Sequence, residues 1–173
     1  MSEPETASSS SIVSSDHLSH KASELSEFEY GLMVSSNAFN RWVVRCMNAT
    51  GFGELSTLEV LVLNSVNHRQ RAKRANDLCL VLNIEDSHTV TYALKKLVGF
   101  NLVAVEKRGK ESFYLSTERG RDACRQYGRI REACLIESFE QLGLDREEIH
   151  RAAGLLRTLS GLYDQAARAA ATL

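Results

Sequence analysis

The sequence has no long apolar run. No stretch of its 173 residues approaches the roughly 18 consecutive apolar residues that a membrane-spanning helix needs. The N-terminus is polar and acidic, and it lacks the apolar segment of a secretory signal peptide. We therefore expect a cytoplasmic protein without a membrane partner, and its 43% hydrophobic and 25% charged residues are ordinary for a globular chain.

Metal, disulfide and catalytic motifs are also missing. The cysteines lie far apart without a C-x-x-C pair, and no H-x-x-x-H pair occurs. We expect buried, inert thiols at Cys46, Cys79, Cys124 and Cys134, with Cys46 the best candidate if any of them senses redox state. No Gly-rich phosphate loop and no nucleophile–base motif is found. The sequence thus predicts no enzyme, no metal and no cofactor.

Composition divides the chain into four parts. Residues 1–23 are rich in serine and poor in large apolar side chains, so we expect a disordered tail. Residues 24–54 should form a long N-terminal dimerisation helix, residues 55–120 a DNA-binding domain, and residues 121–173 C-terminal dimerisation helices.

Helix signals and turn signals give the order of elements. Capping boxes at Ser26 to Glu29 and Ser56 to Glu59 should open the first two helices, which end near Ala49 and Asn67. A third helix is expected over 72–81, and a fourth follows the N-cap residue Asp86. Runs 102–106 and 112–116 predict a hairpin with Gly109 at its tip, followed by helices over 117–142 and from 146 onward. The fold class is mainly α with a small β-hairpin, a winged helix-turn-helix.

The fourth predicted helix has two different faces. Val90, Ala93, Leu94 and Leu97 recur at helical spacing and should pack inward. The opposite side carries groups that can contact base edges and phosphates, as the recognition helix of a helix-turn-helix does. These DNA-binding candidates are Ser87, His88, Thr89, Thr91, Tyr92 and Lys95.

Positive charge gathers around this helix in a chain whose net charge is −1. Between Arg69 and Lys110, nine basic and four acidic side chains give a net charge of +5. A solvated face is the ordinary explanation of such a run, but its position favours double-stranded DNA. We expect phosphate or minor-groove contacts from the hairpin residues Arg108 and Lys110, and phosphate contacts from Arg69, Arg71 and Lys73.

The long terminal helices have more apolar residues than a small three-helix core can cover. A second copy of the chain would cover them, and two recognition helices about one DNA turn apart would read a pseudo-palindromic site. The alternative is a winged-helix adaptor that binds a protein without sequence-specific DNA binding.

Two segments carry a resemblance to a known family. Residues 89–103 (TVTYALKKLVGFNLV) and 117–121 (TERGR) resemble the recognition helix and the helix after the wing of the MarR family of bacterial transcriptional regulators. The resemblance runs from Ser26 to the C-terminus and implies a homodimeric DNA-binding regulator. Four features depart from the family pattern: Tyr92 stands for a frequent arginine, Asn101 for a glycine, Ser116 for a core leucine, and the wing lacks the frequent Asp-x-Arg.

The resemblance also implies an effector site. MarR relatives often bind a small aromatic or phenolic acid between the dimer helices and the DNA-reading lobe. The residues expected at that junction are Phe39, Asn40, Val43, Phe52, Leu63 and Asn67. Ordinary core packing is the alternative for the aliphatic and aromatic members. More loosely, the serine-rich lead and residues 92–96 resemble an alphaproteobacterial subgroup that controls cell-wall remodelling.

Overall fold

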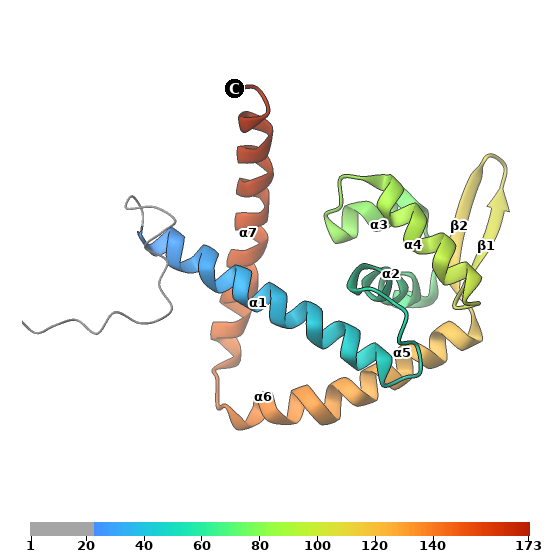
Figure 1. The fold of residues 1–173 in the computed structure, drawn as a ribbon, viewed down its shortest axis with the longest axis horizontal. Coiled ribbons are helices and arrows are strands. Elements are labelled where there is room, and N and C mark those ends of the chain that lie inside the picture. The colour runs from blue at the N-terminus through green and yellow to red at the C-terminus, as the bar shows by residue number, and fades with distance from the viewer. Residues whose placement is uncertain (1–22) are drawn as a thin grey trace, which may run out of the picture. The chain divides into compact units, whose positions relative to one another are not determined.

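The computed structural model describes residues 23–173, so nearly all of the predicted serine-rich tail lies outside the described residues. The described chain falls into two compact units, one ending at Tyr127 and the other running from Gly128 to Leu173. The mainly helical fold with one small hairpin is confirmed (Figure 1).

The first unit contains the winged helix. Its elements in chain order are α1 (Ser23–Asn48), α2 (Thr57–Asn67), the short 3-10 helix η1 (His68–Gln70), α3 (Ala75–Leu82), α4 (Ser87–Gly99), β1 (Val103–Arg108), β2 (Glu111–Ser116) and most of α5 (Glu118–Arg131).

One hydrophobic core holds this unit together. The inward stripe predicted for the fourth helix is confirmed, since Val90, Ala93, Leu94 and Leu97 of α4 are all 0 or 1% exposed. They pack in one cluster with residues from α1, α2, α3, β1 and α5, among them Val43, Met47, Leu63, Leu78, Val103 and Ala123. The opposite face of α4 is therefore the one that remains free.

The start of α1 differs from the prediction. The helix begins at Ser23, so Ser26 lies inside it and does not act as an N-cap. Ser26 is 4% exposed, and Glu24 places a carboxylate in the first turn, where it complements the helix dipole. A capping-box pattern reports local spacing only, and here the helix already runs through Ser26.

The start of α2 follows its signal. Ser56 is the N-cap of α2 and its Oγ accepts a hydrogen bond from the backbone N–H of Glu59, at 3.4 Å. In return the N–H of Ser56 donates to Oε2 of Glu59 at 2.7 Å. The second predicted capping box is confirmed.

The third helix is shorter than predicted, because α3 begins at Ala75 and not at Ala72. Lys73 instead pairs with Tyr114 as a single antiparallel bridge, with N–H to O distances of 2.9 and 2.8 Å. The edge of β2 offers backbone donors and acceptors that helical spacing in the sequence does not reveal.

The hairpin leads into α5 through a close backbone contact. Antiparallel β1 and β2 pair from Val103–Ser116 to Arg108–Glu111, which leaves a two-residue turn with Gly109 at φ 62°. Thr117 then receives the N–H of Gly120 on its Oγ1 at 3.0 Å. A Cβ on Gly120 would lie 2.0 Å from the carbonyl oxygen of Leu102, so only glycine fits there.

The second unit consists of helices without a buried core of their own. The end of α5 continues through a five-residue π-helical segment, η2 (Glu132–Ile136), into α6 (Glu137–Gln141), where one uninterrupted helix was predicted. Gly143, with φ 61°, lies in the turn after α6. Asp145 is the N-cap of α7 (Arg146–Ala170), and its side chain accepts the N–H of Glu147 at 3.0 Å. Every residue from 128 onward is half-buried or exposed.

The cysteines only partly match the expectation of buried thiols. Cys46 is 1% exposed, and its Sγ lies 3.6 Å from the carbonyl oxygen of Tyr127, so it lacks the access that a redox sensor needs. Burial raises the pKa of the Cys124 thiol to about 11. Cys134 is exposed, contrary to the prediction from its helical spacing.

Candidate nucleic-acid interface

Helix α4 presents the predicted polar face to solvent. Asp86 caps it by accepting the N–H of His88 at 2.9 Å and the hydroxyl of Thr89 at 2.8 Å. The hydrogen bond from Thr89 is the larger and that from His88 the smaller of the two effects that hold the pKa of the Asp86 carboxyl below its usual range. Tyr92 is 71% exposed, and Lys95 is exposed beside it. Tyr92 and Lys95 thus lie in solvent on the side of α4 opposite the core residues.

The two threonines of α4 use their hydroxyls within the helix. Thr89 Oγ1 donates to Asp86, and Thr91 Oγ1 donates to the carbonyl oxygen of Ser87 at 2.9 Å. Thr91 is half-buried. Their hydroxyl oxygens can still accept a hydrogen bond, and the Thr91 methyl group can pack on a thymine methyl.

In the wing, Arg108 is bonded to a neighbouring carboxylate, whereas Lys110 makes no ion pair within residues 23–173. Nε and Nη2 of Arg108 donate to the carboxylate of Glu106 at 3.1 and 2.9 Å. The guanidinium carbon of Arg108 lies 4.6 Å from the ring centre of Phe113. The bond from Arg108 holds the pKa of the Glu106 carboxyl below its usual range. Lys110, in the turn, is exposed and makes no ion pair within residues 23–173.

The basic loop after α2 corrects one predicted contact. The ammonium of Lys73 donates to the carbonyl oxygens of Val66, His68 and Arg71 at 3.0, 2.6 and 3.3 Å. These bonds use its three N–H groups at the C-terminal end of α2, where the helix dipole favours a cation. The pKa of Lys73 is lowered mainly by the partial burial of its ammonium group and to a smaller extent by the positive charge of Arg71. Lys73 is therefore a structural cap and not a free phosphate ligand.

Arg69 and Arg71 remain exposed on this loop. Arg69 and Gln70 both have positive φ, 59° and 47°, so the loop makes a tight turn between α2 and the strand-like residue Lys73. Neither arginine forms an ion pair in the described part of the chain.

Several other charges of the basic stretch are already paired. Arg74 contacts Asp77 at 3.0 Å and Glu111 at 3.2 Å, and Lys96 contacts the buried Glu59 at 3.0 Å. Within residues 23–173, the cations of the stretch that make neither an ion pair nor a side-chain hydrogen bond are Arg69, Arg71, Lys95 and Lys110. The free positive charge is thus concentrated at the basic loop, the outer face of α4 and the tip of the wing. Figure 1 shows α4 next to the β1–β2 hairpin.

Comparison with known proteins identifies the domain and the fold. Residues 55–120 match the model of a winged helix DNA-binding domain. No curated protein sequence matches the chain. Similar solved structures include AbfR of Staphylococcus epidermidis, with a TM-score of 0.65 and 15% identity over 82% of this chain and 92% of that one. The chain has the MarR fold.

Two further structures support this assignment. A MarR-family transcriptional regulator from Rhodococcus sp. RHA1 has a TM-score of 0.60 and 16% identity, over 82% of this chain and 96% of that one. CouR from Rhodococcus jostii RHA1, whose structure contains p-coumaroyl-CoA, has a TM-score of 0.59 and 15% identity, over 76% and 90%. The matching domain model is that of a winged helix DNA-binding domain, and the solved structures show that the described chain shares their fold. No helix within residues 23–173 is long and apolar enough to cross a membrane.

Three of the four departures from the MarR pattern have structural explanations. Asn101 has φ 56°, a left-handed conformation that asparagine tolerates better than most residues other than glycine. Ser116 is 3% exposed and donates to Oδ1 of Asn67 at 2.9 Å, so a polar pair occupies a position where an apolar contact was expected. Glu106 precedes Arg108 by two residues, so the wing keeps an acid-x-Arg pair with glutamate in place of aspartate.

The structure places the six residues expected to form the effector site in different surroundings. Val43 and Leu63 belong to the hydrophobic core at 0% exposure. Asn67 is bonded to Ser116, while the carbonyl oxygen of Asn40 accepts the hydroxyl of Thr57 at 3.2 Å in a separate groove. Phe39 is 52% exposed. Val43 of α1 and Leu63 of α2 therefore fit the packing alternative, because both side chains face the core.

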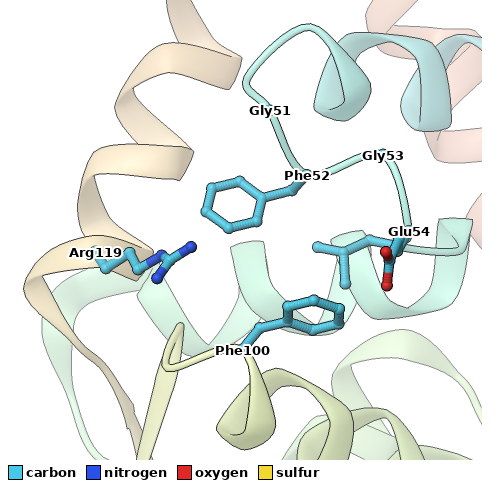
Figure 2. Close-up of a pocket in the computed structure, with 7 residues that line it drawn as sticks. Gly51, Phe52, Gly53, Glu54, Phe100 and Arg119 are labelled. Atoms are coloured by element: carbon cyan, nitrogen blue, oxygen red, sulfur yellow. The ribbon is translucent and has the colours of Figure 1, made fainter.

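The remaining candidate, Phe52, lines a small pocket that sequence reasoning missed. Its ring lies 5.2 Å from the guanidinium carbon of Arg119, across the loop after α1 and the first turn of α5 (Figure 2). The two residues stand far apart in the sequence, so no local pattern could have paired them.

Proposed function

We propose that this protein is a sequence-specific DNA-binding transcriptional regulator that acts as a homodimer on pseudo-palindromic promoter sites. The observation that carries the proposal is the solvent-facing side of α4, on which Tyr92 is 71% exposed and Lys95 is exposed and makes no ion pair within residues 23–173. A helix of this kind enters the major groove, and its exposed side chains read base edges there. The winged helix domain match and the MarR fold support the same function.

Selection of binding sites from fragmented genomic DNA by the purified protein tests this proposal. We expect a short inverted repeat whose half-sites are about one helical turn apart, roughly 10 base pairs centre to centre. Failure to enrich any sequence, with the protein still folded, would instead favour the protein–protein adaptor.

The terminal helices support the dimer. Leu32, Met33 and Phe39 on α1 are 37, 51 and 52% exposed, and Leu155 and Leu162 on α7 are 50 and 51% exposed. Apolar side chains repeated along helices in this way are stable in water only when another surface covers them. We propose that a second copy of the chain provides that surface.

Light scattering of full-length variants tests the dimer. The unmodified protein should have about twice the chain mass of 19.3 kDa. Replacing Leu155 and Leu162 by glutamate should yield monomers, because two charges would have to be buried in the interface. Leu80→Glu, at an 82% exposed leucine of α3, is the matched control and should remain dimeric. A dimer that persists in the double variant would contradict the use of α7.

We also propose that a small aromatic molecule modulates DNA binding. CouR, which shares the fold, is bound to p-coumaroyl-CoA in its crystal structure. A thermal-shift screen of aromatic acids and their CoA thioesters, followed by DNA-binding titrations with each hit, tests this. A hit that raises the melting temperature and weakens operator binding is the expected result. A complete screen without such a hit would contradict the proposal.

A further inference from the structure

A groove lies on the surface of the winged-helix unit between α2 and α3, which are neighbours in Figure 1. Its volume is about 300 Å³, and its walls are mainly apolar. It is lined by Leu61 and Ser65 of α2, His68 of η1, and Leu78 and Val81 of α3. None of the six residues expected at the effector site lines it, so it is a different surface.

The open side of this groove exposes an aliphatic side chain. Val81 is 71% exposed, although Leu78, one turn earlier on α3, is fully buried. Leu61, on the opposite wall, is half-buried. An aliphatic side chain placed in the groove would remove this surface from water, which is favourable in proportion to the apolar area covered.

Positive charge borders the groove at one end. His68 lines the groove, and the basic loop that follows it contains Arg69 and Arg71. Both arginines are exposed, and neither forms an ion pair within residues 23–173. The groove therefore favours a polypeptide segment that combines aliphatic side chains with a nearby acidic group.

A segment of this composition precedes α1 in the same chain. Residues 1–22 lie outside the described residues, and their three acidic side chains and one lysine give a net charge of −2 with histidine neutral. The branched aliphatic side chains of this segment are Ile12, Val13 and Leu18. Asp16 follows Val13 by three residues, which is about 10 Å in an extended chain.

This N-terminal segment is long enough to return to the winged-helix unit. Val13 precedes Ser23, the first residue of α1, by ten residues, which can span about 33–36 Å when extended. Val43, which packs in the same hydrophobic cluster as Leu78 of the groove, lies about 30 Å along α1 from Ser23. Because the segment is tethered, its effective concentration at a surface within reach is high, in the millimolar range for short linkers.

We propose that residues 12–18 of the chain dock in this groove, with their aliphatic pair against Val81. Asp16 then lies beside the basic loop and pairs with Arg69 or Arg71. In that position it competes with DNA phosphates for the two arginines, so the docked segment lowers the affinity for DNA of any sequence. The docking depends only on the groove, whereas its effect on DNA rests on the proposed function.

Two-dimensional NMR of the full-length protein without DNA tests the docking. Replacing Ile12 and Val13 together by serine should shift the amide signals of Ser65 and Val81, because the groove then loses its occupant. The melting temperature of this variant should equal that of the unmodified protein, since the hydrophobic core is not changed.

Matched variants separate docking from unrelated effects. Ser8→Ala with Ser9→Ala changes the same number of residues in the N-terminal segment and should leave the groove signals in place. In the reverse direction, Val81→Ser should shift the amide signal of Val13, whereas Leu80→Ser should not. Leu80 is 82% exposed on the same helix but does not line the groove.

DNA titrations of full-length variants test the competition. Asp16→Asn should raise the affinity for specific and random DNA alike by about two- to fivefold at low salt, which is the effect of losing one exposed ion pair. Glu3→Gln removes the same charge outside residues 12–18 and should raise the affinity less. Fluorescence anisotropy measures both changes.

Each part of the proposal can be overturned separately. Groove signals that do not respond to the Ile12 and Val13 variant would overturn the docking, and signals that shift only with protein concentration would overturn it in favour of a second copy. Equal DNA affinities of the Asp16→Asn and Glu3→Gln variants would overturn the competition. If no variant binds DNA while the groove signals respond as expected, the proposed function fails and the docking is supported.

Discussion

Lys96 on α4 and Glu59 on α2 form an ion pair with 3.0 Å between Nζ and Oε2, and the Glu59 side chain is only 7% exposed. The same carboxylate also accepts the N–H of Ser56, and Lys96 also donates to the carbonyl oxygen of Glu54. One lysine on the recognition helix thereby binds the cap of α2 and the loop before it. The adjacent Lys95 is exposed and unpaired within residues 23–173.

Neighbouring lysines should therefore respond differently to substitution. Lys96→Met leaves the Glu59 carboxylate buried without its cation, so we expect a loss of about 1–3 kcal/mol in the free energy of unfolding, measured with urea. Lys95→Met should leave that free energy nearly unchanged. It should weaken DNA binding and lower the salt slope by about one unit. Equal stability of the two variants would contradict the role of the ion pair.

Gly120→Ala should be among the most damaging single changes in the chain. Its Cβ would lie 2.0 Å from the carbonyl oxygen of Leu102, and backbone on both sides cannot move easily. We expect a loss of about 3 kcal/mol or more, or an insoluble protein. Gly128→Ala, in the same helix with nothing within 4 Å, should instead be neutral or gain about 0.5–1 kcal/mol. Thermal melting of both variants provides the comparison.

The wing should contribute affinity without much sequence preference. Replacing Arg108 and Lys110 by alanine should weaken binding to all DNA sequences alike and reduce the salt slope by roughly one to two units. Fluorescence anisotropy at several salt concentrations measures both effects. The double variant Arg41→Ala and Arg45→Ala removes the same charge from α1 and should change the slope less. Unchanged affinity and slope in the wing variant would mean that the hairpin does not touch DNA.

Alkaline pH should destabilise the fold through Cys124. Burial raises the pKa of this thiol to about 11, from 9.0 when it is free in water. Between pH 9 and 11 the unfolded chain loses the thiol proton while the folded chain keeps it, so the unfolded state is favoured as the pH rises. The stability present below pH 9 should fall by about 2–3 kcal/mol over this range. Cys124→Ala should remove this part of the pH slope, and Cys134→Ala, at an exposed position, should keep it.

Sequence reading should depend on Tyr92 and Thr91. Tyr92→Ala and Thr91→Ala should leave the melting temperature nearly unchanged, because the core uses the opposite face of α4. Each should cost on the order of 1–3 kcal/mol in binding to the preferred site and much less on random DNA. Equal losses on both kinds of DNA would assign these side chains to phosphates. Tyr92→Phe separates the hydroxyl from the ring.

Local chemistry determined much of this fold from the sequence alone. The spacing of Val90, Ala93, Leu94 and Leu97 correctly oriented α4, because a helical repeat fixes which side chains share a face. Ser56 with Glu59 and Asp86 marked helix starts, because their hydrogen bonds span only three residues. Gly109 and its flanking β-branched and aromatic residues placed the hairpin for the same reason.

Contacts between distant segments were decided only by the tertiary structure. The backbone of Lys73 pairs with Tyr114 of β2, and its ammonium group caps the C-terminal end of α2. The sequence predicted a phosphate contact for this residue, whereas in the structure its side chain stabilises the fold. Lys96 forms an ion pair with Glu59, and Arg119 contacts the ring of Phe52, although each pair is separated in the sequence by more residues than a helical or strand repeat covers. Sequence patterns thus determined which face of each element is apolar or charged. Which of those charges remains free depends on partners that folding brings together from far along the chain, and only the structure shows them.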